Sequence, residues 1–485
     1  MPKRSVGFLL LLLLVLDTAY SFVQHLHLPL DGDLAGIVMP HEMYRQVLAD
    51  PFGLAVLLRD EVYNAPNRFF AHAALSGYFK HVPLLLQVLV SPIDSVYWAS
   101  AIFKTLTQLG LIALLAAYIT RSGRVLSGRF LVAALLVTPL FHASGYNIQM
   151  GIIDKASTYT AFYALPLGLL GLFFLPFYRA ASSRQPPRPG VVGGGLLLAL
   201  AVVLSLSGPL VAPVVLLVCP VALARLGWQR FQAAGAGPGW RRTRAALGQL
   251  PGAYLFFFGF ISLLCLYSYY IGLNNAENLQ STISLSARYA RLPLGLFYEL
   301  TVKPGLPLLL LAIALNIVLM RRYAPSAAAD QLLAHFKWLA MLAGFYVLLL
   351  PLGGYRDYRP YIIRYDTFQP VVLALVYAFG ASSYYLLSAI LPRFKRRYTI
   401  GLVGLLTFYT LADKPTIGAN DCEKQALRDI ASSPDKVAVI NADCTIMRWG
   451  KITGTYDSET VAELLAYWGI TSEKKLFYQR PGVAW

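Results

Sequence analysis

Residues 370–412 read PVVLALVYAFGASSYYLLSAILPRFKRRYTIGLVGLLTFYTLA. Two apolar runs, 370–391 and 398–412, flank a basic turn at 393–397. A helix needs roughly 20 apolar residues to cross a membrane. Short loops rich in Lys and Arg are typical of the cytoplasmic side. This stretch therefore predicts a pair of membrane helices whose connecting turn lies inside.

The same alternation repeats along most of the chain. About eleven apolar runs are predicted to be membrane spans, near residues 5–22, 96–119, 130–145, 156–178, 191–205, 209–224, 254–273, 304–320, 338–352, 370–391 and 398–412. The expected fold class is an all-α polytopic membrane protein.

Six basic clusters fix the expected orientation. They contain twenty Lys or Arg side chains, and a single acid, Asp330, lies within the same segments. The clusters are Lys3-Arg4, Arg121/Arg124/Arg129, Arg179/Arg184/Arg188, Arg225/Arg230/Arg241/Arg242/Arg244, Arg321/Arg322/Lys337 and Arg393/Lys395/Arg396/Arg397. Placing them inside predicts a multi-pass protein of the plasma (inner) membrane, with a cytoplasmic N-terminus and an extracytoplasmic tail.

The composition agrees with this assignment. Hydrophobic residues make up 57% of the chain, charged residues 13%, and the mean hydropathy is +0.56. A soluble domain carries about 25% charged residues. The net charge of +17 resides largely in short loops between apolar runs. It therefore predicts contact with anionic lipid headgroups and not with nucleic acid.

The predicted membrane domain, 1–412, is followed by a tail of different composition, 413–485. The tail has ordinary charge density and alternating helix and strand patterns, which predict a small extracytoplasmic α/β module. Cys422 and Cys444 lie in this tail. Because disulfides persist outside the cytoplasm, the two cysteines are candidates for a bridge.

An acidic pair, Asp31-Gly32-Asp33, follows the first apolar run, early in a long first outer loop at 23–95. Two crowded carboxylates can supply a general base, because crowding raises the pKa of one of them. They can also share a divalent metal, with His25 and His27 as further candidate ligands. The alternative is a plain turn, since Asp and Gly both favour turns.

This layout resembles the GT-C superfamily of membrane glycosyltransferases. The resemblance lies in the Asp31-Gly32-Asp33 motif after span one, the amphipathic first loop, the number of spans and the outward C-terminal module. It implies a polyprenyl-phosphate-linked sugar as donor and a first-loop Asp, Asp33 or Asp31, as catalytic base. The W-W-D-Y-G signature of oligosaccharyltransferases is absent from the tail, so transfer of a whole oligosaccharide to protein is not expected.

A second polar segment, GGYRDYRPYIIRYD at 353–366, places three arginines on the predicted outer side. This is against the general excess of Lys and Arg on the cytoplasmic side. Arg binds phosphate in a bidentate manner. Arg356, Arg359 and Arg364 are therefore predicted to hold the donor phosphate. The alternative is internal pairing with Asp357 and Asp366.

Weaker candidates are polar residues of the outer loops that could line the same cavity, each with a structural role as the alternative. They are Asp60, Glu61, Arg68, His72, Asp154 and Lys155. Lys104 lies inside a predicted span, where a charge is a functional hypothesis by default; the alternative is that it reaches the interface along its own stem.

The predicted reaction is inverting transfer of one sugar to an unidentified acceptor on the outer face. No cofactor is required, although a divalent metal is compatible with the acidic pair. The alternative is a non-enzymatic transporter or lipid flippase, which would place several ionisable residues deep in its spans. A ligase or polymerase of envelope polysaccharides is a third possibility, but its key residues usually lie in a later outer loop.

Overall fold

The computed structural model describes residues 4–40, 42–142, 150–183, 185–233, 239–279, 283–355 and 361–480. In these residues, eight helical segments are long and apolar enough to cross a membrane. They are α1 (Arg4–Leu26), α6 (Pro92–Thr120), the continuous run Ser157–Ser183, α11 (Val211–Ala233), α13 (Gly252–Leu273), α16 (Gly305–Tyr323), α17 (Ala327–Leu349) and α18 (Tyr365–Ala389). The chain is a helical, multi-pass membrane protein.

Three other predicted spans form helices with weaker membrane character. The helix α7 (Gly128–Val137), continued by the turn η1 (Thr138–Phe141), and α10 (Val191–Ser205) are apolar but short. The helix α19 (Pro392–Leu411) begins with the basic cluster, which lowers its mean hydropathy.

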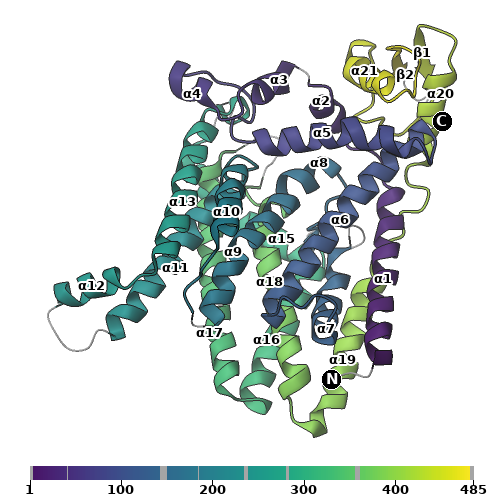
Figure 1. The fold of residues 1–485 in the computed structure, drawn as a ribbon. Helices are drawn as coiled ribbons and strands as arrows, with labels where there is room; N and C mark the ends of the chain where they lie inside the picture. Colours follow the sequence, from purple (N-terminus) through teal and green to yellow (C-terminus); the bar gives the residue numbers. More distant parts are fainter. Residues whose placement is uncertain are drawn as a thin grey trace.

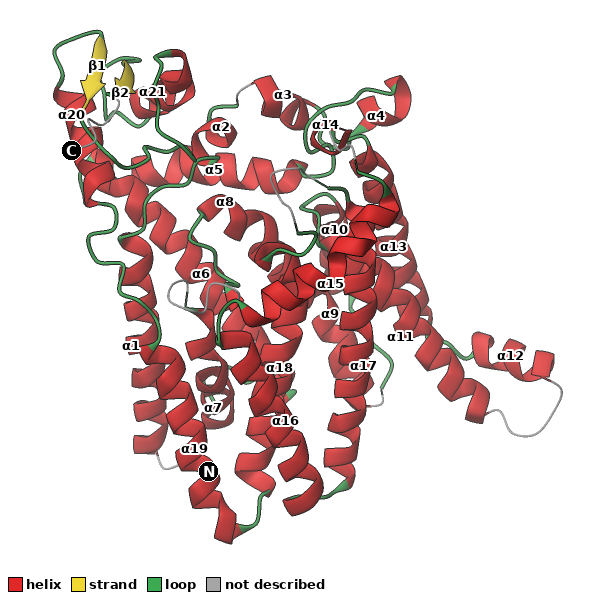
Figure 2. Cartoon of the chain, turned by 180° about the vertical axis from the view of Figure 1, so that it is seen from behind, coloured by secondary structure: helices red, strands yellow, loops and turns green. Residues whose placement is uncertain are grey.

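The two ends of the bundle differ in character. The start of α1, the α16–α17 turn and the α18–α19 turn lie at the lower end in Figures 1 and 2. Arg321 and Arg322 end α16, and the basic cluster 393–397 starts α19, so the basic clusters of these turns lie at that end. The amphipathic helix α12 (Gly239–Gly248) extends sideways from the bundle, toward the same end.

The upper end carries short helices and the C-terminal elements (Figure 1). The first loop forms a layer of four helices: α2 (Leu34–Val38), α3 (Glu42–Ala49), α4 (Leu54–Arg59) and α5 (Phe69–Leu86). Two further helices, α14 (Ala276–Leu279) and α15 (Leu285–Thr301), lie between α13 and α16 in the chain, and the turn η4 (Leu350–Gly353) follows α17.

The C-terminal segment packs onto this layer. It comprises α20 (Asp421–Ser432), β1 (Val437–Ile440), η5 (Tyr456–Ser458), α21 (Glu459–Tyr467) and β2 (Leu476–Gln479). The two strands are parallel, with Val437 opposite Leu476. Trp468 is fully buried, and its indole donates a hydrogen bond to the carbonyl oxygen of Phe79 in α5 at 2.9 Å.

Burial separates the central helices from the peripheral ones. More than half of the apolar stretch is buried in α6 (56%), in the run Ser157–Ser183 (61%) and in α18 (56%), against 6% in α1. The run Ser157–Ser183 begins with α8 (Ser157–Tyr159), continues as η3 (Thr160–Ala164) and ends as α9 (Leu165–Ser183). Each of these three central segments contributes charged or polar groups to the upper end of the bundle.

Candidate functional site

Asp31 is held rigidly inside the upper end of the bundle. It is 6% exposed, and its carboxylate accepts hydrogen bonds from the Thr158 hydroxyl at 2.8 Å and the Thr158 amide at 3.2 Å. The amide of Asp33 donates a third bond at 3.3 Å. Burial raises the pKa of Asp31 above its usual range, whereas these bonds and the charge of Lys104 oppose that rise.

Lys104 supplies a buried positive charge beside this carboxylate. It is 1% exposed, and its ammonium group donates to the carbonyl oxygen of Lys155. Its charged neighbours are Asp31 and Asp154. Lys104 therefore does not reach the membrane interface along its stem; it points into a polar cluster formed by α6 and the segment before α8.

Asp154 is the second buried carboxylate of the cluster. It accepts a hydrogen bond from the Ala156 amide at 2.7 Å and another from the Tyr365 hydroxyl at the start of α18. Burial raises its pKa, and these bonds together with the charges of Lys104 and Arg364 oppose the rise. Lys155, the next residue and another candidate for the cavity lining, has an exposed side chain, whereas Asp154 is 7% exposed.

Arg364 precedes α18 and pairs with Asp366. Its Nε donates to Asp366 Oδ1 at 2.9 Å, and Nη2 contacts Oδ2 of the same carboxylate. The guanidinium also lies 5.7 Å from the ring centre of Tyr159. The internal pairing considered for this arginine is therefore present, and 21% of its side chain remains exposed. Arg356 and Arg359 lie outside the described residues.

Asp33 faces the C-terminal segment. The carboxylate accepts a hydrogen bond from the indole nitrogen of Trp449 at 2.9 Å. The Trp449 ring lies 5.8 Å from that of Tyr159, the same ring that contacts Arg364. The side chains of Trp449 and Tyr159 thus connect Asp33 to Arg364. The two carboxylates of the acidic pair have different partners, Thr158 for Asp31 and Trp449 for Asp33.

Gly32 has a packing role in this arrangement. A Cβ at position 32 would lie 2.4 Å from the Trp449 amide nitrogen and 2.7 Å from the Arg448 carbonyl carbon. The close approach of the C-terminal backbone therefore needs glycine between the two aspartates.

Glu423 of α20 connects the C-terminal segment to the residues next to the acidic pair. It accepts hydrogen bonds from the Leu30 amide at 2.8 Å, the Tyr97 hydroxyl at 2.9 Å and the Met447 amide at 3.0 Å. Burial raises its pKa to about 7 despite these three donors. The predicted Cys422–Cys444 disulfide is confirmed, with a Cα–Cα distance of 6.2 Å. The bridge links Cys422, which precedes Glu423, to Cys444, which begins the segment that leads to Trp449.

A π-helical turn, Thr160–Ala164, follows α8 directly. Such turns occur frequently at functional sites. Here the turn follows Thr158 and Tyr159, which contact Asp31 and Arg364. A hydrogen bond of 2.6 Å between the hydroxyls of Ser100 and Ser157 joins α8 to α6.

Two of the weaker candidates lie away from this cluster. Asp60 is exposed at the end of α4, and Glu61 accepts hydrogen bonds from Arg59 and Gln46. Both figures place α4 at the opposite side of the upper end from the C-terminal elements. These two acids therefore do not line the site around Asp31.

Arg68 directly precedes α5, and His72 lies in its first turn as a packing residue. It is 2% exposed and lies between the rings of Tyr44 and Phe162, at 5.2 and 4.8 Å. Burial lowers the pKa of His72 to about 3, with a smaller contribution from the charge of Arg68. Its imidazole is therefore neutral, and a role in acid–base chemistry near pH 7 is not supported.

The histidines before the acidic pair have other partners. His25 contacts Gln108 Oε1 at 3.3 Å, and His27 accepts a hydrogen bond from the Gly418 amide at 3.3 Å. Within the described ranges, no group of three or more His, Cys, Asp or Glu is placed to hold a metal ion.

Four contributors to the site were not singled out from the sequence: Thr158, Tyr159, Glu423 and Trp449. Thr158 and Tyr159 lie within a predicted span, where a hydroxyl group in the sequence does not by itself indicate a functional role. Trp449 follows Arg448 in the predicted outer tail, and a Trp in that polar segment is the available signal in the sequence.

A scan against protein-family models finds no family that matches this chain, and searches of curated proteins and of solved structures find no match either.

Proposed function

We propose that this protein is a membrane glycosyltransferase that moves a sugar from a polyprenyl-phosphate donor to an acceptor on the outer face. The supporting observation is the gathering of Asp31, Asp33, Lys104, Asp154 and Arg364 at one end of the bundle. These residues come from four distant parts of the sequence. Perturbed carboxylates next to cationic groups are characteristic of functional sites.

In the proposed mechanism Asp33 is the general base. It is half-buried, whereas Asp31 is enclosed by Thr158. The Asp33 carboxylate takes the proton of the acceptor hydroxyl while the acceptor oxygen bonds to the anomeric carbon. The bond from that carbon to the phosphate oxygen breaks, its electron pair stays on the phosphate, and the configuration inverts.

The cationic groups have separate roles in this scheme. The exposed part of the Arg364 guanidinium would support the leaving phosphate, with Arg356 and Arg359 as further proposed donors. Lys104 is buried, so it would balance the charge of Asp31 and Asp154 and not touch the substrate. Transfer in this form needs no metal, and a divalent ion remains compatible with it.

The proposal includes the membrane arrangement. We place α7, α10 and α19 in the membrane as additional spans, which gives about eleven in a GT-C-like architecture. The N-terminus is cytoplasmic, residues 413–485 form an extracytoplasmic module, and the host is the plasma (inner) membrane. Labelling of single cysteines introduced by Trp240→Cys and Gly450→Cys checks this. An impermeant reagent should label position 450, and not position 240, in intact cells.

Analysis of lipid-linked sugars in cells lacking the protein tests the function. A polyprenyl-phosphate monosaccharide should accumulate, and the wild-type gene should clear it. Asp33→Asn should fail to clear it, whereas Asp60→Asn should succeed, because Asp60 is an exposed acid of the same loop outside the site. An unchanged lipid profile in the deletion strain would overturn the proposal.

One observation favours the alternative, a transporter or flippase. His142 lies between two acids, 3.3 Å from Asp17 Oδ1 and 3.0 Å from Asp413 Oδ2. Asp17 belongs to α1, and buried ionisable groups at membrane depth often mark proton or ion pathways. Loss of proton-coupled uptake on His142→Gln, with lipid-linked sugars unchanged, would support this alternative.

A further inference from the structure

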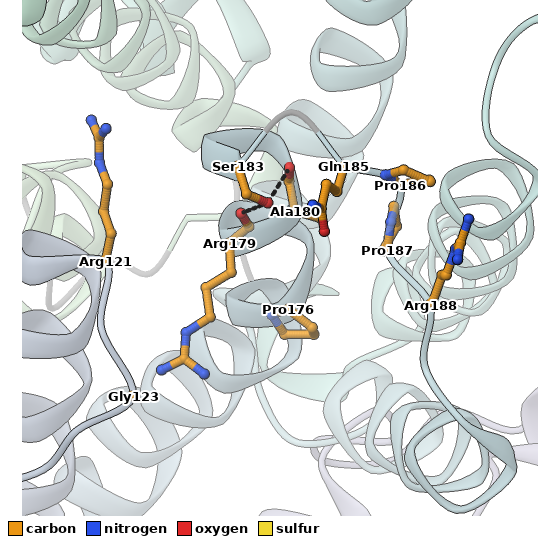
Figure 3. A pocket seen from close by; sticks show the side chains of 10 residues that line it. All are labelled: Arg121, Gly123, Pro176, Arg179, Ala180, Ser183, Gln185, Pro186, Pro187 and Arg188. Carbon is orange, nitrogen blue, oxygen red and sulfur yellow. Dashed lines mark hydrogen bonds between the residues drawn. The ribbon is translucent and has the colours of Figure 1, made fainter.

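A basic pocket lies at the other end of the bundle from the acidic site. It is a cavity of about 710 Å³ between the ends of α6 and α9 and the link that leads to α10 (Figure 3). Binding sites for small molecules typically occupy about 300–1,000 Å³. The pocket is therefore large enough for a ligand headgroup. Its lining includes Arg121, Arg179, Arg188, Ser183 and Gln185.

Three arginines line the pocket, and its lining includes no acidic residue. Figure 3 shows Arg179 between Arg121 on one side and Arg188 on the other. Among the described residues, none of these three arginines forms an ion pair. A bound anion would therefore meet uncompensated positive charge on both sides of Arg179.

Arg179 is the best-fixed member of the pocket. Its Nη2 donates a weak hydrogen bond of 3.4 Å to the carbonyl oxygen of Ser122, and its Nε is buried without a hydrogen-bond partner. Gly123 lies against this guanidinium, since a Cβ there would be in ordinary contact with Nη2 at 3.4 Å. With one weak hydrogen bond, the Arg179 guanidinium keeps donor capacity beside the pocket, and an anionic oxygen is a suitable acceptor.

The location of the pocket restricts the ligand. It follows the lower end of α6 and α9, at the end of the bundle that the charge pattern predicts to be cytoplasmic. Basic pockets between membrane helices on that side bind phosphate-bearing headgroups. Arg matches phosphate oxygens with a planar fork of donors. We propose that this pocket binds a phosphate group, presented either by an anionic lipid of the adjacent leaflet or by a soluble phosphate compound.

Binding to the purified full-length protein tests the pocket without reference to sugar transfer. Native mass spectrometry would follow phosphatidylglycerol, with zwitterionic phosphatidylcholine as control, and calorimetry would follow inorganic phosphate and pyrophosphate. The variant Arg121→Gln/Arg179→Gln/Arg188→Gln should lose affinity by roughly tenfold for each arginine that contacts the ligand. Binding of phosphatidylglycerol alone assigns a lipid source, and binding of the inorganic ions assigns a soluble one.

A matched control removes the same charge from the same end of the bundle. The variant Arg321→Gln/Arg322→Gln/Arg396→Gln changes three arginines outside the pocket and should bind within about twofold of wild type. The double variant Arg121→Gln/Arg188→Gln, in which both side chains are exposed, serves if the triple variant does not fold. Equal loss in pocket and control variants, or no binding of any probe to wild type, would overturn the proposal.

Discussion

Replacing Gly32 with Ala should displace the C-terminal segment from the acidic pair. The new Cβ would lie 2.4 Å from the Trp449 amide nitrogen and 2.7 Å from Trp449 Cγ. Non-bonded carbon contacts are most favourable at about 3.5–4.0 Å, so the segment would have to move by about 1 Å. Such overpacking typically costs roughly 1–3 kcal/mol. Loss of the indole hydrogen bond to Asp33 adds about 1 kcal/mol, giving roughly 2–4 kcal/mol against the closed segment.

Trypsin cleavage after Arg448 in the purified protein measures this opening. Where cleavage passes through a transiently open state, its rate follows the population of that state. A change of 2–4 kcal/mol then predicts cleavage that is roughly 30-fold faster or more. The fragments can be identified by mass spectrometry, because the Cys422–Cys444 bridge lies wholly before the cut.

Gly36→Ala is the matched control, four residues along the chain. Its Cβ would meet Tyr44 at 3.7 Å, an ordinary contact. Position 36 is inside α2, where Ala is preferred to Gly by about 1 kcal/mol. Cleavage after Arg448 should therefore be unchanged. Equal cleavage rates in Gly32→Ala and Gly36→Ala would refute the packing argument and the reason given for glycine in this motif.

Three further predictions concern the supports of the site. Removal of the disulfide by Cys422→Ser and Cys444→Ser, which are 22 positions apart, should destabilise the C-terminal segment by about 3 kcal/mol through loop entropy; unchanged proteolysis of residues 413–480 would contradict this. The pKa of Glu423 in the folded protein is about 7, above its usual 4.5. The free energy of unfolding should therefore fall by about 3 kcal/mol as the pH rises from 4.5 to 7, and then level off. In thermal unfolding, Glu423→Gln should abolish this pH dependence, at the cost of the hydrogen bond from Met447. Lys104→Met should leave two buried carboxylates without their cation and lower the stability by roughly 1–3 kcal/mol, and a wild-type unfolding midpoint at pH 7 would count against the cluster.

The membrane helices were predictable because apolar length is a property of local sequence. Eight of the eleven predicted spans satisfy both length and composition in the described chain. The remaining three show where this signal weakens. Two of them, α7 with η1 and α10, are short, and α19 takes its first turns from the basic cluster that marks its end of the bundle.

The acidic pair was predictable from its position after the first span, but its partners were not. Thr158 lies 127 residues from Asp31, and Trp449 lies 416 residues from Asp33. Contacts at such separations depend on how the helices pack, and no local pattern encodes them. Proximity in the sequence also gave a wrong prediction, because Asp60 and Glu61 share the first loop with Asp31 but lie at the opposite side of the upper end of the bundle. The pairing of Arg364 with Asp366, two residues away, was visible as an alternative because it is local.

The most direct test of the account measures sugar transfer by the reconstituted protein with the lipid-linked sugar that accumulates in the deletion strain. Asp33→Asn should lower the rate by roughly 10²–10⁴-fold, as expected for loss of a general base, while the thermal unfolding midpoint stays near that of wild type. Asp60→Asn should retain the wild-type rate. Transfer by Asp33→Asn at the wild-type rate would contradict the assignment of the acidic pair as the catalytic centre.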